Sequence, residues 1–204
     1  MSTLTLYYAP GTCALAVRIA LEEAQAGYQL QRLDFAHQQQ RSADYLALNP
    51  KGRVPALATE QGVLTETPAL LTYVAQCFPA AQIAPLADPF AMARMQEFNS
   101  YLASTVHVAH AHGRRASRWA DTPEAIAAMQ RKVPQTMAEC FDVIEQHYLQ
   151  GPWVLGDAYS VADAYLFTIA GWLEGDGVDI QRFPKVAAHF ARMALRPAVQ
   201  RALD

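Results

Sequence analysis

Cys13 is the residue of this sequence best placed for thiol chemistry. It follows a strand-like segment at residues 4–8, a turn at Pro10 and Gly11, and Thr12, and it stands where a helical pattern of apolar residues begins. Backbone N–H groups without partners at a helix N-terminus favour a negative charge, so we expect this position to stabilise a thiolate. A small buried cysteine that happens to begin a helix is the alternative, and position alone leaves both interpretations open.

Two further motifs could bind an extended ligand with charged ends. Glu66 and Thr67 stand between a predicted strand and a predicted helix. There the carboxylate could hold an ammonium group, while the Thr67 hydroxyl and the helix N-terminus could hold a carboxylate; capping by Thr67 is the simpler interpretation. Val54 and Pro55 open another strand. If the bond between them is cis, the Val54 backbone could pair with an extended peptide, although trans is the more frequent isomer.

A basic segment follows in the second half of the chain. Its charged and titratable residues are His107, His110, His112, Arg114, Arg115 and Arg118. A metal site is disfavoured because no carboxylate or cysteine stands nearby to complete a ligand set. A solvated helix face and a positive wall beside a pocket, which would favour an anionic ligand, both remain open. The hydroxyls of Tyr8 and Thr12 lie near Cys13 in sequence and could take its place, although packing is the preferred explanation for Tyr8.

Composition excludes several classes of protein. The chain has 204 residues, of which 52% are hydrophobic and 17% charged, so it can form a core and is not expected to be disordered. A net charge of -3 without a long basic run argues against a nucleic-acid-binding protein. Cys13, Cys77 and Cys140 form no disulfide or zinc pattern and suit a reducing cytoplasm, and the last two are interpreted as structural. We expect no export signal and no membrane span.

The elements that would position these residues fall into two regions. Residues 1–78 carry strand and helix signals in the order βαβαββα, and the first strand–helix–strand unit is expected to have a right-handed crossover. The predicted strands are 4–8, 28–34, 54–58 and 63–65, and the predicted helices are 13–27, 42–48 and 67–77. Residues 79–88 contain two prolines and no periodicity, so they are predicted as a linker.

Residues 89–204 are predicted to be helical throughout. The predicted helices are 89–115, 122–148 with a bend at Pro134, 160–172, and two that begin at 183 and 196. Ser160 and Asp163 have the spacing of a capping box, which would fix the start of an apolar helix. The sequence therefore predicts an α/β domain followed by an all-α domain.

Motifs along the whole chain resemble those of one family. After the Pro-Gly-Thr-Cys run come residues 49–57 (NPKGRVPAL), residues 64–67 (LTET) and, in the helical region, residues 156–167 (GDAYSVADAYLF). In this order the chain resembles the cytosolic glutathione S-transferases, and the Pro-Gly-Thr-Cys run resembles the bacterial beta class.

The resemblance implies a thioredoxin-like N-terminal domain that binds glutathione and a helical domain that forms most of the electrophile pocket. Val54 would pair its backbone with the cysteinyl part of glutathione, with Pro55 in cis. Glu66 and Thr67 would hold the γ-glutamyl amine and carboxylate. Cys13 would lie beside the glutathione sulfur, donating a hydrogen bond to the thiolate or forming a mixed disulfide with it.

The resemblance assigns further residues outside these motifs. His107 matches a helical-domain histidine that approaches the same sulfur, with Ser104 in the preceding turn. Ser100 stands where the family has an asparagine, and Gln38, or His37 after a shift, stands where it has a lysine; both are assigned to glutathione binding. The residues that we assign to the electrophile pocket are Tyr8, Thr12, His110, Arg114 and Arg115.

We therefore expect a cytoplasmic detoxification enzyme that binds glutathione as a thiolate and transfers it to small electrophiles, with Cys13 and His107 as catalytic residues. Thiol–disulfide exchange through Cys13 is an additional expected reaction. Glutathione is the co-substrate, no metal is expected, and the resemblance implies a homodimer. The alternatives are a glutathione-dependent isomerase or dehalogenase and a non-catalytic binding or regulatory module.

Overall fold

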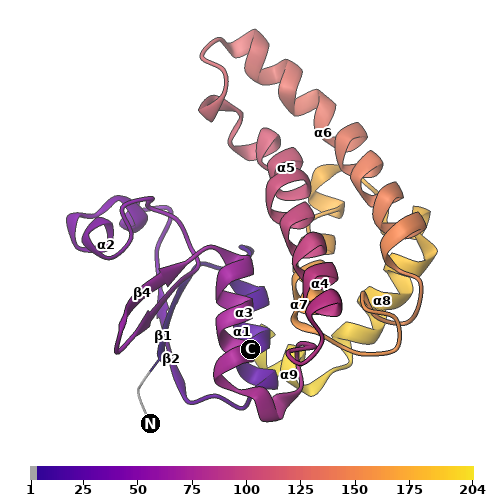
Figure 1. The fold of residues 1–204 in the computed structure, drawn as a ribbon. Helices are drawn as coiled ribbons and strands as arrows, with labels where there is room; N and C mark the ends of the chain where they lie inside the picture. Colours follow the sequence, from indigo (N-terminus) through magenta and orange to yellow (C-terminus); the bar gives the residue numbers. More distant parts are fainter. Residues whose placement is uncertain (1–3) are drawn as a thin grey trace.

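The computed structural model describes residues 4–204 (Figure 1). Its N-terminal domain contains a four-stranded sheet with the strand order β2–β1–β3–β4, in which β1 and β2 are parallel and β3 is antiparallel to both of its neighbours. The elements in chain order are β1 (Leu4–Tyr8), α1 (Ala14–Glu23), β2 (Tyr28–Arg32), α2 (Ala43–Leu48), β3 (Ala56–Thr59), β4 (Gly62–Thr65) and α3 (Thr67–Cys77). The predicted order βαβαββα and the thioredoxin-like fold class are confirmed.

Alternation along the strands sends apolar side chains to both faces of the sheet. On one face, Leu6 of β1 and Leu57 of β3 are fully buried in the main core with α1 and α3, which lie between the sheet and the C-terminal helices (Figure 1). On the other face, Ala56 packs with Leu33 and with Tyr45 of α2. α2 therefore covers the second face, and the loops on either side of it reach the cavity described below.

The C-terminal domain is helical, as predicted (Figure 1). After the short turn η2 (Pro79–Ala81), the elements are α4 (Pro89–Tyr101), the π-helical η3 (Leu102–Val106), α5 (His107–Arg114), η4 (Ala116–Arg118), α6 (Pro123–Val143), the π-helical η5 (Ile144–Tyr148), α7 (Val161–Ala170), η6 (Glu174–Asp176), η7 (Ile180–Arg182), α8 (Pro184–Ala194) and α9 (Pro197–Leu203). α5 and α6 pack together as a pair that extends away from the sheet. Within residues 4–204, no helix is long and apolar enough to cross a membrane.

Two π-helical stretches lie within segments that the pattern predicts as continuous α-helix. The segment 89–115 is interrupted by η3, and the segment 122–148 ends in η5. Pro134 lies inside α6 without ending it. Single π-turns often occur next to functional sites, and η3 leads directly into His107, the first residue of α5.

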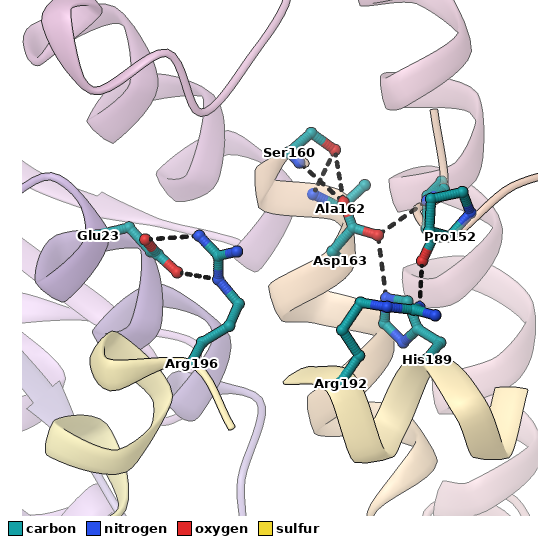
Figure 2. A network of polar contacts seen from close by, with 9 residues as sticks. Glu23, Pro152, Ser160, Ala162, Asp163, His189, Arg192 and Arg196 are labelled. Atoms are coloured by element: carbon teal, nitrogen blue, oxygen red, sulfur yellow. Dashed lines mark hydrogen bonds and ion pairs between the residues drawn. The ribbon is translucent and has the colours of Figure 1, made fainter. Parts of the chain in front are cut away.

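α7 is buried along its whole length, and its first turn is fixed by a buried polar network (Figure 2). Asp163 accepts hydrogen bonds from the backbone N–H groups of Ser160 and Val154, each at 2.8 Å, and its Oδ1 lies 3.0 Å from Nε2 of His189 in α8. The Ser160 side chain accepts from the backbone of Ala162. The predicted capping box is confirmed, and its carboxylate also ties α7 to α8 and to the preceding loop.

The two domains are joined through α1, which packs against α7 and α9. Beside this apolar contact, Arg196 forms a bidentate ion pair with Glu23 at 2.6 and 3.0 Å (Figure 2), and Arg201 pairs with Glu22 at 2.7 Å. Residues from the C-terminus of the chain therefore hold the helix whose N-terminus carries Cys13.

Candidate functional site

A cavity of about 260 Å³ lies between the two domains. It is lined by loops at one edge of the sheet, by the N-termini of α1 and α3, and by residues of α5, η4 and α7. The predicted site residues that line it are Thr12, Cys13, Val54, Pro55, Glu66, Thr67, His107, His110 and Arg115.

Cys13 occupies the N-cap position of α1 and is almost fully buried. Burial raises the pKa of its thiol, and the lowering effects of the Thr67 hydroxyl and of Arg115 do not compensate. The thiol donates a hydrogen bond to the carbonyl oxygen of Val54 at 3.8 Å. Burial therefore opposes the thiolate that we expect the helix N-terminus to favour at Cys13.

The loop before β3 presents free backbone groups to the cavity. The Val54–Pro55 bond is cis, as the resemblance implies. The carbonyl oxygen of Arg53 accepts from the Tyr45 hydroxyl at 2.6 Å and from the Asn49 amide at 2.7 Å, which anchors the loop. The N–H of Val54 donates to no acceptor in the described part of the chain. A backbone donor without a partner is therefore available to an extended ligand.

Glu66 and Thr67 meet at the N-terminus of α3. Glu66 precedes the helix with a φ of 72°, a strained conformation for a residue with a side chain, and such strain is concentrated at functional positions. Its Oε1 accepts from the ammonium group of Lys51 at 2.6 Å, while Oε2 has no partner among residues 4–204. Lys51 also donates to the Thr65 hydroxyl at 2.5 Å. This corner already holds one ammonium group and has an oxygen left for a second.

His107 lies in the helical wall of the cavity. Burial, together with the positive charges of His110, Arg115, Arg53 and Arg118, lowers the pKa of His107 to about 4. The imidazole is therefore neutral at pH 7, so it can donate or accept a hydrogen bond without adding charge to the site.

His110 is paired with a buried carboxylate. Its Nδ1 lies 2.9 and 2.8 Å from the two oxygens of Asp176 in η6, and its ring stacks on Trp172 with 4.3 Å between centroids. The other ring nitrogen, Nε2, contacts no hydrogen-bonding partner in the described chain, and His110 lines the cavity. A carboxylate on one nitrogen fixes the ring and leaves the other nitrogen for proton transfer. Residues 4–204 contain no group of three or more His, Cys, Asp or Glu side chains that could hold a metal ion.

Several assigned residues do not line the cavity, and their proposed roles stay predictions. Tyr8 packs against the main core, and Gln38 is an exposed residue with a φ of 53°. The remaining assigned residues outside the cavity are His37, Ser100, Ser104 and Arg114.

Local contacts explain these positions. Exposed His37 lies with Nδ1 2.7 Å from an oxygen of Asp34. The hydroxyl of Ser104 donates to the carbonyl oxygen of Ser100 at 2.8 Å on an exposed surface. Arg114 is exposed, one residue before the cavity residue Arg115.

Arg118, which belongs to the basic segment predicted as a possible positive wall, also lines the cavity. Lining residues that were not assigned from the sequence include Lys51 and Arg53 within the 49–57 motif, Gln40 and Arg41 before α2, Trp119 after η4, Tyr165 in the middle of α7 and Trp172 just after it. The hydroxyl of Thr12, which does line the cavity, donates to the carbonyl oxygen of Ala9 at 2.7 Å. Its donor is thus already used within the turn.

Comparisons with known proteins identify the family that this chain resembles. Residues 2–76 match the model of the glutathione S-transferase N-terminal domain, and residues 123–192 match that of the C-terminal domain. A solved structure of a glutathione transferase homologue from Sulfitobacter with bound glutathione is 51% identical, covers 100% of this chain and 98% of that chain, and has a TM-score of 0.97. Glutathione S-transferase GstA of Escherichia coli O157:H7 is 32% identical over 98% of each chain. A maleylacetoacetate isomerase of Pseudomonas aeruginosa is 26% identical over 96% of this chain and 92% of its own.

Proposed function

Because the chain belongs to the glutathione S-transferase family, we propose that it binds glutathione in this cavity and transfers the glutathione sulfur to electrophilic small molecules. The observation that carries the proposal is the unpaired N–H of Val54 between Cys13 and the Glu66–Thr67 corner in one cavity wall. A tripeptide with a thiol in its middle and an α-amino acid at one end fits this order of groups.

Glutathione would lie along the loop before β3. Its cysteinyl backbone would pair with Val54, its γ-glutamyl ammonium would contact the free oxygen of Glu66, and its γ-glutamyl carboxylate would accept from Thr67 at the start of α3. Its sulfur would then lie beside Cys13. The supporting facts are the free backbone group of Val54 and the free carboxylate oxygen of Glu66.

In this arrangement the nucleophile belongs to glutathione and not to the protein. The Cys13 thiol would donate a hydrogen bond to the glutathione thiolate and so stabilise that anion. Glutathione first loses its thiol proton to solvent. Its sulfur then attacks the electrophilic carbon, and the leaving group departs with its electron pair. Thiol–disulfide exchange would require Cys13 to lose its proton first, so we propose it as a slower side reaction.

Two measurements test this function. Titration calorimetry with glutathione should show saturable binding, and conjugation of 1-chloro-2,4-dinitrobenzene should exceed the uncatalysed rate. Cys13→Ala should reduce conjugation without abolishing it. Folded protein that binds no glutathione contradicts the proposal, and binding without conjugation of any acceptor would leave the non-catalytic module as the function.

Glutathione-dependent isomerisation is a second candidate, favoured by the pairing of His110 with Asp176. Addition of a thiolate to a conjugated double bond creates an enolate, and a positioned imidazole can move the proton that this step requires. A relative named maleylacetoacetate isomerase is similar over most of the chain. Conversion of a cis-enedione to its trans isomer, dependent on glutathione and lost in His110→Ala, would support this reaction; conjugation alone would argue against it.

We further propose that the protein acts in detoxification in a reducing cytoplasm, as a homodimer. The three cysteines Cys13, Cys77 and Cys140 are free thiols, which supports a reducing compartment. Light scattering coupled to size-exclusion chromatography tests the dimer, and a monomeric mass at micromolar concentration would contradict it.

A further inference from the structure

The cavity carries more positive charge than glutathione can neutralise. Its cationic side chains are Arg41, Lys51, Arg53, Arg115 and Arg118. Glu66 is the one carboxylate among the described residues that line the cavity, and it pairs with Lys51. The histidines aside, the wall therefore has a surplus of four positive charges.

The four guanidinium groups have no protein partner within residues 4–204, neither an ion pair nor a side-chain hydrogen bond. All four line the same cavity, and burial together with the charges of Arg115, Arg53 and Arg41 lowers the pKa of Arg118. Arg41 and Arg53 come from the N-terminal domain, whereas Arg115 and Arg118 come from η4 and the residue before it. An unneutralised cluster of this kind destabilises the free protein, and a bound anion relieves the repulsion.

Glutathione accounts for part of this charge. Its two carboxylates, ammonium and thiolate give a net charge of about -2 at neutral pH, which leaves roughly half of the surplus uncompensated. Even if Arg41 and Lys51 serve the carboxylates of glutathione, Arg53, Arg115 and Arg118 remain. Val108, Trp119 and Trp172 supply an apolar surface to the same cavity.

We propose that the acceptor of this enzyme is an anionic electrophile: an aromatic or conjugated molecule that carries a carboxylate or a related oxyanion, held by Arg53, Arg115 and Arg118. The inference rests on the proposed transferase function and names the substrate class for it. The planar guanidinium group matches a carboxylate through two parallel hydrogen bonds, and the indole rings match a flat conjugated system. The oxyanion is held and does not react; the sulfur still bonds to the electrophilic carbon, and the leaving group departs as in the neutral case.

The test compares two acceptors that react alike with and without the acid group. We would measure kcat/KM for 1-chloro-2,6-dinitrobenzene and for 4-chloro-3,5-dinitrobenzoate, each divided by its uncatalysed rate with glutathione. Each releases chloride as sulfur bonds to the ring. The charged acceptor should be favoured at least about tenfold, the effect expected of one charge-assisted contact, and high salt should reduce this preference.

Substitutions show which arginines produce the preference for the charged acceptor. Arg115→Gln with Arg118→Gln should lower the preference for the charged acceptor by about ten- to a hundredfold, and Arg53→Gln alone by less. Arg115→Lys with Arg118→Lys should keep part of this preference, because the positive charge remains but the planar guanidinium group, which makes two parallel hydrogen bonds, is lost. Arg114→Gln, next in sequence but outside the cavity, should keep the wild-type preference. Thermal melting and glutathione affinity check that each variant is folded.

The outcomes separate this inference from the function on which it rests. If the neutral acceptor reacts and the preference is near one, or survives the double Gln substitution, the transferase stands and the anionic acceptor is overturned. If glutathione binds but neither acceptor reacts, affinities for the two S-aryl glutathione products decide: tighter binding of the acidic product, lost in the double variant, supports the arginine site, and equal binding overturns it. If glutathione does not bind, both proposals fail.

Discussion

The two walls of the cavity are built in different ways. The N-terminal wall combines charged side chains with backbone groups and short turns: the free N–H of Val54, the cis bond before Pro55 and the start of α3 at Thr67. The helical wall uses long or titratable side chains, chiefly Arg115, Arg118 and the pair His110–Asp176. Contacts from a backbone tolerate changes of side chain, whereas contacts from side chains change with every substitution. A constant co-substrate suits the first wall and a variable acceptor suits the second.

The largest expected effect comes from removing the support of the helical wall. Asp163→Ala deletes the buried acceptor that joins α7 to His189 and to two backbone N–H groups. Leaving these donors buried without a partner should lower the free energy of unfolding by about 3–5 kcal/mol. Urea denaturation measures the loss. Asp157→Ala, an exposed carboxylate in the preceding loop, should stay close to wild type; equal losses in both variants would show that α7 does not depend on the network.

The titration of His107 should appear in the stability of the whole protein. The pKa of His107 is about 4 in the folded protein and 6.5 in the unfolded chain. Between these pH values the unfolded chain therefore binds a proton at His107 and the folded protein does not. Stability from this residue is complete above pH 6.5 and is lost as the pH falls toward 4, by roughly 3 kcal/mol in total. The free energies of unfolding of wild type and His107→Gln, measured by denaturation across this pH range, should diverge as the pH falls. If the two change in parallel, the pKa of His107 is not lowered in the folded protein.

Glutathione affinity should depend on the N-terminal wall alone. Glu66→Gln removes the carboxylate proposed to hold the γ-glutamyl ammonium, and the Kd for glutathione should rise about ten- to a hundredfold. Calorimetry measures it, and turnover of neutral and charged acceptors at low glutathione should fall by the same factor. Glu60→Gln, in the turn between β3 and β4, is the matched control. A loss of turnover with only one of the two acceptors would contradict the assignment of glutathione binding to the N-terminal wall alone.

The smallest expected effect sharpens the helical wall. Asp176→Asn should lower kcat for glutathione-dependent isomerisation about tenfold while the Kd for glutathione stays within a factor of about two, because the change frees His110 without touching the N-terminal wall. Asp176→Asn should add nothing in a His110→Ala background if the carboxylate acts through the imidazole. Glu174→Gln, exposed in the same turn, should behave as wild type.

Local signals explain why much of the fold could be predicted. The strand Leu4–Tyr8 ends before a Pro-Gly turn, and the helix Thr67–Cys77 starts beside a proline at its first turn, so both were bounded correctly by neighbouring residues. The capping box of α7 is equally local. The π-helical η3 was not predicted, because a single extra residue in a turn does not disturb the apolar pattern enough to be seen.

The candidate site was predictable only where its residues belong to short motifs. Cys13, Val54 and Glu66 stand in such motifs, and the structure brings all three to one cavity. Asp176 stands 66 residues after His110 and no pattern links them, so their contact needed the packing of η6 against α5 and α6. The burial of Cys13 was also unpredictable, because it depends on core residues that are distant from it in sequence.

The residues that fasten α1 are translated long after α1 itself. Glu23 and Glu22 pair with Arg196 and Arg201, which follow them by 173 and 179 residues. While a ribosome is still translating, the sheet and α1 can emerge and form, but the partners of these two carboxylates do not yet exist. The nascent chain therefore completes the placement of Cys13 only after residue 201 has emerged from the ribosome. A premature stop codon at position 196 would produce a chain whose helix α1 lacks both of these ion pairs.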